Sequence, residues 1–231
     1  LYYLASFLPL FVENWRNKSG VKVVSVQRLP SLGTKKPVED TAVAGMSHYI
    51  SLTFEATPLA VQLFRPGYYV QLLAPEVSPI SHPFTINSVP GKANQLRVIF
   101  KVLGKFTTQL SQKIQDTLSD QHTDVTSAID NMPKIQIQGY LGVPHRLQEV
   151  LQHDVAVIIA GGIGITPYLS LLHQVHEILS SGGTNLRTKR VVLLWMCRDA
   201  SLVDYVKQEY LIPLVQATHD TDADFKMKFI I

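Results

Sequence analysis

The sequence predicts two lobes, a six-stranded antiparallel β-barrel followed by an incomplete, doubly wound α/β parallel sheet. Short runs rich in Val, Ile, Phe and Tyr, separated by Pro, Gly, Ser and Asn, fill residues 21–140, as is typical of a small antiparallel barrel. From Asp154 onward, continuous apolar runs alternate with helical patterns, which is typical of a parallel sheet. A chain of 231 residues with 46% hydrophobic residues is long and apolar enough for two cores.

The barrel elements follow in order along the first lobe. Strands are expected at residues 21–29, 49–56, 68–74, 84–89, 95–102 and 134–140. The turn RPGYYV at 65–70 leads into the third strand, because Pro presets one backbone dihedral and Gly accepts the next. A short helix is expected at 107–114 with Thr107 or Thr108 as its cap, and a surface loop at 115–131.

The sequence of the second lobe predicts the order strand, helix, strand, helix, strand. The run VAVIIA, at 155–160, predicts a strand buried on both faces. A helix follows to about Ser180, and the later elements are expected at 190–196, 202–215 and 225–231. This order forms half of a doubly wound sheet. Because such a sheet normally continues, we expect a nucleotide-binding domain at 151–231 that is truncated at its carboxy end.

The amino-terminal segment predicts contact with a membrane. Residues 1–12 are apolar, and Trp15, Arg16 and Lys18 follow. This run is shorter than the roughly 20 residues that a span needs, but the aromatic and basic residues suit the cytoplasmic end of a span. We therefore expect residues 1–20 to be the end of a span or a membrane-proximal helix; the alternative is an amphipathic surface or core helix. The barrel domain is then expected at 21–150.

Composition and scattered polar residues argue against several other functions. The net charge is only +3 and the basic residues form no stripe, so no nucleic acid partner is expected. The single cysteine, Cys197, rules out an internal disulfide and fits a reducing compartment. His173 and His176 lie one helical turn apart without a third ligand, so no metal site is expected. Neither a Ser-His-Asp set nor paired carboxylates occur, so we assign no catalytic residue.

The segment AGGIGITP predicts a site for an anion. It follows a buried strand and opens a helix, where backbone N–H groups and the helix dipole attract negative charge. Glycines allow a sharp turn and close approach of a pyrophosphate, while Thr166 can cap the helix and Pro167 suits its first turn. The alternative is an ordinary tight turn between strand and helix. The usual dinucleotide fingerprint has a third glycine where this chain has Thr-Pro.

The segment WMCRD places Arg198 after the second strand, at the carboxyl edge of the sheet where ligands of such sheets bind. A guanidinium there can clamp a phosphate through paired N–H bonds, so Arg198 is a candidate for reading the 2′-phosphate of NADPH. The alternative is a solvated arginine paired with Asp199 or Glu209. Cys197 has no base partner in the sequence and suits a small packed residue.

The segment SHPFTINSVP, residues 81–90, has the groups that a flavin requires. Phe84 can cover the ring, Thr85 can supply a hydroxyl, and Pro83 fixes the backbone between them. His82 and Lys101 can provide polar contacts. The alternative is a strand entry with an ordinary, hydrogen-bonded histidine.

In four motifs the sequence resembles the cytosolic dehydrogenase region of the NADPH oxidase and ferric reductase family, within the ferredoxin-NADP reductase superfamily. The motifs are HPFTINS, KVLGKFT, AGGIGITP and WMCRD, in this order. The resemblance implies an FAD-binding barrel, an NADPH-binding lobe and an upstream membrane domain that carries two b-type haems. Lys101 stands where the family usually has arginine, which keeps the charge but loses the bidentate fork.

The resemblance also assigns cofactor contacts residue by residue. Those for FAD are His82, Pro83, Phe84, Thr85, Ile86 and Ser88, with Lys101, Gly104 and Thr107 near its pyrophosphate. Those for NADPH are Gly161, Gly162, Ile163, Gly164, Thr166, Pro167, Cys197 and Arg198.

The function that the resemblance implies is transfer of a hydride from NADPH to FAD. Single electrons then pass to haem in the membrane domain, and from there to dioxygen or a ferric chelate. This region would lie on the cytosolic side of a membrane protein, with its own haem domain as partner and possible regulatory subunits. Two alternatives are a non-catalytic interaction module on the same fold and a soluble NADPH flavin reductase.

Overall fold

A computed structural model describes residues 20–29, 49–119, 129, 131–182, 186–220 and 225–231. Residues 1–19, which carry most of the expected membrane-proximal segment, lie outside this set. Within the described ranges, no helix has both the length and the apolar character needed to cross a membrane.

The first lobe is a six-stranded antiparallel sheet in the order β1-β2-β5-β4-β3-β6. Its strands are β1 (Val23–Leu29), β2 (Tyr49–Glu55), β3 (Tyr69–Leu73), β4 (His82–Val89), β5 (Lys92–Lys101) and β6 (Gln136–Leu141). The Val21 N–H donates to the Ile135 carbonyl at 2.7 Å, which joins the chain before β1 to the chain before β6. The strands enclose one apolar core, in which Ile50, Leu52, Val70, Leu72 and Val98 have no exposed surface.

Two helices flank the barrel. Helix α2 (Pro58–Leu63) was not predicted, and the Thr57 hydroxyl caps it by accepting from the Ala60 N–H. Helix α3 (Lys105–Ser119) is longer at both ends than the expected 107–114, so its last residues replace the beginning of the predicted loop. Its apolar face, with Phe106, Leu110 and Ile114, packs on the barrel core, and Leu118, beyond the expected end, packs against the same core.

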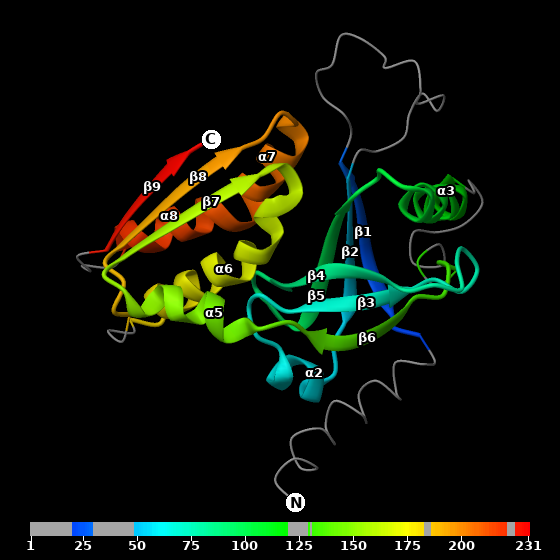
Figure 1. The fold of residues 1–231 in the computed structure, drawn as a ribbon, viewed down its shortest axis with the longest axis horizontal. Coiled ribbons are helices and arrows are strands. Elements are labelled where there is room, and N and C mark those ends of the chain that lie inside the picture. The colour runs from blue at the N-terminus through cyan, green and yellow to red at the C-terminus, as the bar shows by residue number, and fades with distance from the viewer. Residues whose placement is uncertain (1–19, 30–48, 120–128, 130, 183–185, 221–224) are drawn as a thin grey trace, which may run out of the picture.

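The second lobe is a parallel sheet in the order β7-β8-β9, with the expected alternation of strands and helices. Its elements are α5 (Pro144–Gln148), η2 (Glu149–Gln152), β7 (Val155–Gly161), η3 (Gly162–Ile165), α6 (Thr166–Ser180), β8 (Arg190–Met196), α7 (Ala200–Val206), η4 (Lys207–Leu211), α8 (Ile212–Asp220) and β9 (Lys226–Ile230). Figure 1 shows the helices α6, α7 and α8 on the side of the sheet that faces the barrel.

The prediction that β7 is buried on both faces is wrong. Alternate residues of β7 are buried, but Val157 and Ile159 on the other face are 56% and 65% exposed. The pairing register places Ile159 beside Leu194 and Leu194 beside Ile230, so one apolar row crosses the sheet on the exposed face. All three helices pack on the opposite face, and none of the described residues covers this one.

The two lobes share part of one core. Leu29, Tyr49 and Ile99 belong to the barrel strands but are buried together with the helices of the second lobe. Apolar packing therefore continues across the boundary between the lobes, and it fixes which side of the barrel the second lobe covers.

Candidate functional site

Strand β4 changes its neighbour within the HPFTINS segment. Residues His82–Thr85 pair with β3, whereas Ile86–Val89 pair with β5. Among the described strands, the first half of β4 therefore has no partner on the side of β5. Its backbone at that edge is available to a ligand, which fits the prediction that this segment holds a cofactor.

The side chains of this segment point to alternating faces. His82 and Phe84 lie opposite Leu72 and Val70, on the face of the barrel core, while Pro83 and Thr85 lie on the other face. The His82 ring stacks on Phe106 of α3 at 4.1 Å between centroids. The Phe84 ring contacts Phe106 and Phe100 at 6.2 and 5.3 Å. Because Phe84 and Thr85 lie on opposite faces, the flat ring of a flavin can contact both residues only at the open edge of the strand.

The loop between β5 and α3 carries the other residues assigned to FAD. Lys101 is exposed at the end of β5, and Gly104 has open space where a Cβ would lie. The Thr107 hydroxyl accepts from the N–H groups of Leu103 and Gly104, both at 3.0 Å. Thr107 therefore fixes this loop from inside the first turn of the helix, rather than from the residue before it as an N-cap would.

The glycine turn joins β7 to α6 as predicted. Gly162 has φ +48°, a left-handed conformation that favours glycine. A Cβ added at Gly161, Gly162 or Gly164 would meet no protein atom within 4 Å. Internal packing therefore does not require these glycines, and the open space beside the turn fits close approach of a ligand. Pro167 is in the first turn of α6, but Thr166 is buried and makes no cap, so that expectation is wrong.

Trp195 supports the glycine turn from the neighbouring strand. Its indole N–H donates to the Gly162 carbonyl at 2.9 Å, and its ring is 1% exposed. The bond holds the carbonyl inward at the residue with positive φ. Sequence reasoning missed this role, although the tryptophan stands first in the WMCRD motif.

Arg198 and Cys197 follow β8 at the same edge of the sheet as the glycine turn. Register pairs Gly161 with Met196, so Arg198 is two residues beyond the strand end and its side chain is exposed. Asp199 precedes helix α7 and accepts from the Ser201 hydroxyl at 2.8 Å. Burial raises the pKa of the Cys197 thiol, which keeps it protonated near neutral pH.

Strands β5 and β8 both contact the glycine turn between the lobes. The Lys101 ammonium is close enough to Cys197 to oppose the rise of its thiol pKa. Tyr49, which pairs with Lys101 across β2 and β5, has its pKa raised to about 12 by burial and then by Asp199 and Cys197. Strand β5 also contacts the turn at Gly162–Ile165. The strand that ends at Lys101 of the predicted flavin set thus contacts the glycine turn of the predicted nucleotide set.

Two residues assigned to the flavin lie elsewhere. Ile86 is buried in the barrel core opposite Val98. Ser88 faces the second lobe, where its hydroxyl lies 2.8 Å from Nδ1 of His173 and its carbonyl accepts from the Tyr210 hydroxyl at 3.0 Å. The structure therefore places these two side chains away from the open edge of β4.

Two cavities of the structure lie away from the predicted cofactor residues. A cavity of about 640 Å³ lies between the β4–β5 turn and α6, and one of about 440 Å³ lies beside β2 and β6. Neither is lined by His82–Thr85 or by the glycine turn. The described part of the chain holds no group of three His, Cys, Asp or Glu residues able to bind a metal ion.

Comparison with known proteins agrees with the two halves of this site. A model of an FAD-binding domain matches residues 34–145, and a model of the ferric reductase NAD-binding domain matches residues 153–228. The chain is thus similar to an FAD-binding domain over the segment that includes HPFTINS, and to a ferric reductase NAD-binding domain over the segment that includes AGGIGITP.

Named relatives that the chain is similar to include NADPH oxidases. NADPH oxidase 4 of Rattus norvegicus is 34% identical over 142 residues, which is 58% of this chain and 23% of that protein. NADPH oxidase 3 of Rattus norvegicus is 30% identical over 141 residues, 61% of this chain and 23% of that protein. The chain thus matches less than a quarter of the length of these relatives.

Solved structures share the fold at lower identity. An NADH-dependent reduced ferredoxin-NADP oxidoreductase superposes with a TM-score of 0.54 and 17% identity, covering 84% of this chain and 54% of that one. A ferredoxin-NADP⁺ reductase mutant from Plasmodium falciparum gives 0.53 and 15%, covering 92% and 71%. The two-lobe arrangement is thus that of ferredoxin-NADP reductases.

The residues present fit FAD and NADPH, the cofactors that the two matched domain models indicate. The open edge of β4 and the exposed Lys101 and Gly104 leave room beside the barrel. The three glycines leave open space at the start of α6, where a helix N-terminus favours a phosphate. When bound, the two cofactors would supply the redox chemistry.

Proposed function

We propose that this chain is the dehydrogenase region of a membrane NADPH oxidase or ferric-chelate reductase. It would bind NADPH in the second lobe and FAD on the barrel, and orient the nicotinamide toward the flavin. The supporting observation is that strand β5, which ends at Lys101 of the flavin set, contacts the glycine turn at Gly162–Ile165 of the nucleotide set. When bound, FAD accepts a hydride and releases electrons singly.

The chain's own residues would act by binding and orientation. The backbone of His82–Thr85 holds the flavin at the open edge of β4, while Lys101 and the first turn of α3 face its pyrophosphate. The glycine turn holds the pyrophosphate of NADPH, and Trp195 keeps that turn in place. Arg198 reads the 2′-phosphate.

Electrons would then leave for haem in an upstream membrane domain, with this region on the cytosolic side. The relatives named NADPH oxidase favour dioxygen over a ferric chelate as the final acceptor. This direction of transfer requires a bound flavin. Purified protein should therefore be yellow or become so with added FAD, and protein that ignores FAD would favour the interaction module instead.

The sharper experiment concerns nucleotide choice. Arg198→Gln in the FAD-loaded chain should weaken NADPH binding by roughly ten- to a hundredfold and leave NADH nearly unchanged, because only NADPH has the 2′-phosphate. Arg190→Gln is the matched control, since Arg190 is exposed at the opposite end of β8. Calorimetric titration with both nucleotides measures the difference. An equal loss for both nucleotides would mean that Arg198 supports the fold rather than the phosphate.

A further inference from the structure

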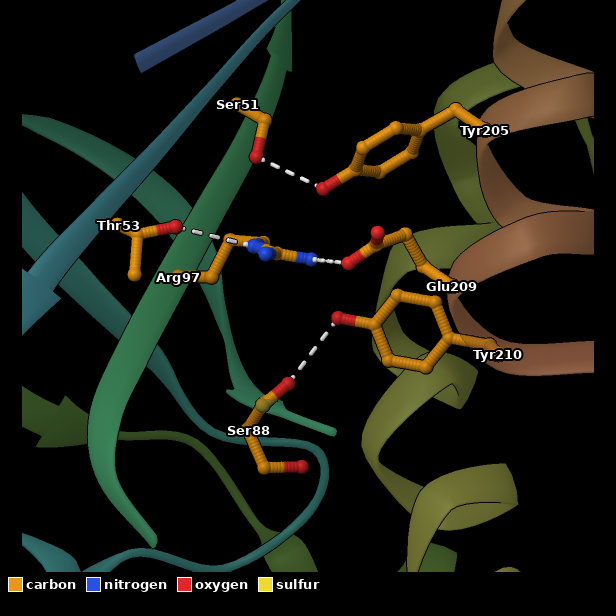
Figure 2. A network of polar contacts seen from close by, with 7 residues as sticks. All are labelled: Ser51, Thr53, Ser88, Arg97, Tyr205, Glu209 and Tyr210. Atoms are coloured by element: carbon orange, nitrogen blue, oxygen red, sulfur yellow. Dashed lines mark hydrogen bonds and ion pairs between the residues drawn. The ribbon is translucent and has the colours of Figure 1, made fainter. Parts of the chain in front are cut away.

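A polar network spans the two lobes away from the cofactor residues (Figure 2). Arg97 of β5 is 5% exposed, donates from Nε to the Thr53 hydroxyl at 3.1 Å, and reaches Oε2 of Glu209 at 2.8 Å. Its guanidinium also lies 5.6 Å from the centre of the Tyr205 ring. Two further bonds run in parallel, since Tyr205 lies 2.9 Å from the Ser51 hydroxyl and Tyr210 donates to the Ser88 carbonyl.

Two of the side chains from the second lobe, Glu209 and Tyr210, lie on a π-helical turn, and Tyr205 lies at the end of the helix before it. Segment η4 (Lys207–Leu211) follows α7 and precedes α8, and the Ile212 N–H donates to the Lys207 carbonyl five residues back. In a regular α-helix, Tyr205 and Tyr210 would point about 140° apart, because each residue turns about 100°. A turn closed five residues back brings them to the same side, so both hydroxyls reach the barrel. Single π turns often mark functional sites.

The Arg97 side chain stays charged although it is buried. Burial alone lowers the pKa of its guanidinium, but Tyr205, Tyr210 and Glu209 outweigh that effect and raise it. Buried ion pairs are often replaceable by apolar residues of similar volume without loss of stability. Such a pair instead fixes orientation, since a planar guanidinium donates to a carboxylate and to a hydroxyl only along its own N–H bonds.

We propose that Arg97 and Glu209 are positioning residues that set the angle between the two lobes, and with it the approach of nicotinamide to flavin. This inference rests on the proposed hydride transfer. Arg97 is four residues before Lys101 on β5, and this strand contacts the glycine turn at Gly162–Ile165, so the lobes' cofactor residues meet along it. A pair that fixes β5 against η4 therefore fixes the geometry of that meeting. Small errors in such geometry cost large factors in rate.

The test is a double variant, Arg97→Met with Glu209→Met, in the FAD-loaded chain. We expect unchanged thermal stability and FAD affinity, because apolar side chains fill the same volume. We expect the single-turnover rate of flavin reduction by NADPH to fall by about ten- to a hundredfold. The matched control is Lys113→Met with Glu76→Met, which removes an ion pair of 3.1 Å within the barrel lobe. A double variant that is reduced at the wild-type rate would overturn the proposal.

A distance measurement separates this inference from the proposed function. Spin labels at Ile80→Cys on the barrel and Ile159→Cys on β7, with Cys197→Ser, report the separation of the lobes at two exposed positions. We expect one narrow distance that broadens or shifts in the double variant and stays narrow in the control.

The two measurements can fail separately. If NADPH fails to reduce the wild-type chain, the proposed function fails. If the distance distribution is unchanged in the double variant, the proposed positioning of the lobes is rejected as well. Should the double variant not fold, Glu209→Gln takes its place in both measurements.

Discussion

The burial of strands β2 and β7 is the opposite of what their sequences suggest. Strand β2, with Ser51 and Thr53, reads as half polar, yet its first six residues are buried. Strand β7 is apolar throughout, yet every second residue is exposed. The outer face of β2 is covered because the second lobe contributes Tyr205 and meets Arg97 there, while the helices of that lobe leave one face of β7 bare.

The difference shows that burial follows from which elements pack together. An apolar run reports a preference for burial, but packing requires a second surface. A hydroxyl on an outward face is compatible with full burial when another lobe supplies a hydrogen-bond partner. The Ser51 hydroxyl of β2 thus contacts the second lobe directly, and the Thr53 hydroxyl holds Arg97, which contacts it. The predictions below test this comparison.

The largest effect should come from breaking the polar contact over β2. Glu209→Ala leaves the Arg97 charge buried without its carboxylate, so unfolding free energy should drop by about 3–5 kcal/mol. Glu55→Ala is the control, because its ion pair with Lys22 is exposed and long at 3.7 Å; it should cost less than about 1 kcal/mol. Urea titration measures both. Equal losses of unfolding free energy in the two variants would show that the buried ion pair of Arg97 stabilises the chain no more than an exposed one.

The next largest difference in stability is expected between two neighbouring isoleucines of β7, one buried and one exposed. Ile158 is 3% exposed and Ile159 is 65% exposed. Ile158→Ala should therefore cost about 2–4 kcal/mol, whereas Ile159→Ala should stay within about 1 kcal/mol, because little apolar surface is lost from a core. Unfolding by urea gives both values. A large loss at Ile159 would mean that this face is covered in solution.

A smaller effect is expected at the second hydroxyl contact of β2. Tyr205→Phe removes the bond to Ser51 but keeps the ring near Arg97, so stability should fall by about 0.5–1.5 kcal/mol. Replacing both partners, Tyr205→Phe with Ser51→Ala, should recover part of the loss, since no hydroxyl then remains unpaired. A double-mutant cycle measures this coupling, and zero coupling would contradict the contact.

The smallest effect should be a pH dependence at the other contact between lobes. Burial, then His176, lowers the pKa of His173 below its ordinary 6.5, although Glu177 acts to raise it. Ser88 of β4 faces the same ring. The unfolded chain then binds more protons below about pH 6.5, so this contribution is complete above that pH and is lost as the pH falls. His173→Gln should flatten the decline in urea midpoint between about pH 7.5 and about 5.5, and an unchanged slope would exclude His173 as its source.

The local elements could be predicted from sequence because their signals are local. Each barrel strand has its own aliphatic run and turn residues, and AGGIGITP has a strand before it and a helix after it. The fold class and the place of the glycine turn are confirmed on that basis. The errors at α3 and β7 arise where packing against another element decides length or exposure.

The contacts between lobes could not be predicted in the same way. Ser51 and Tyr205 are 154 positions apart, and Arg97 and Glu209 are 112 apart, so no spacing rule links them. The π turn that delivers Tyr210 also has no sequence signal that we recognised. For Arg198, the sequence offered Glu209 as a possible partner, but the structure gives that carboxylate to Arg97.

The bond between Trp195 and the Gly162 carbonyl has an optical consequence. Indole emission responds to its hydrogen bonds and to nearby acceptors, and the chain has only one other tryptophan, Trp15. With Trp15→Phe, all tryptophan fluorescence originates beneath the glycine turn. Binding of a nucleotide at the glycine turn can then be followed from the emission of the unlabelled protein, because the emitting indole is bonded to that turn.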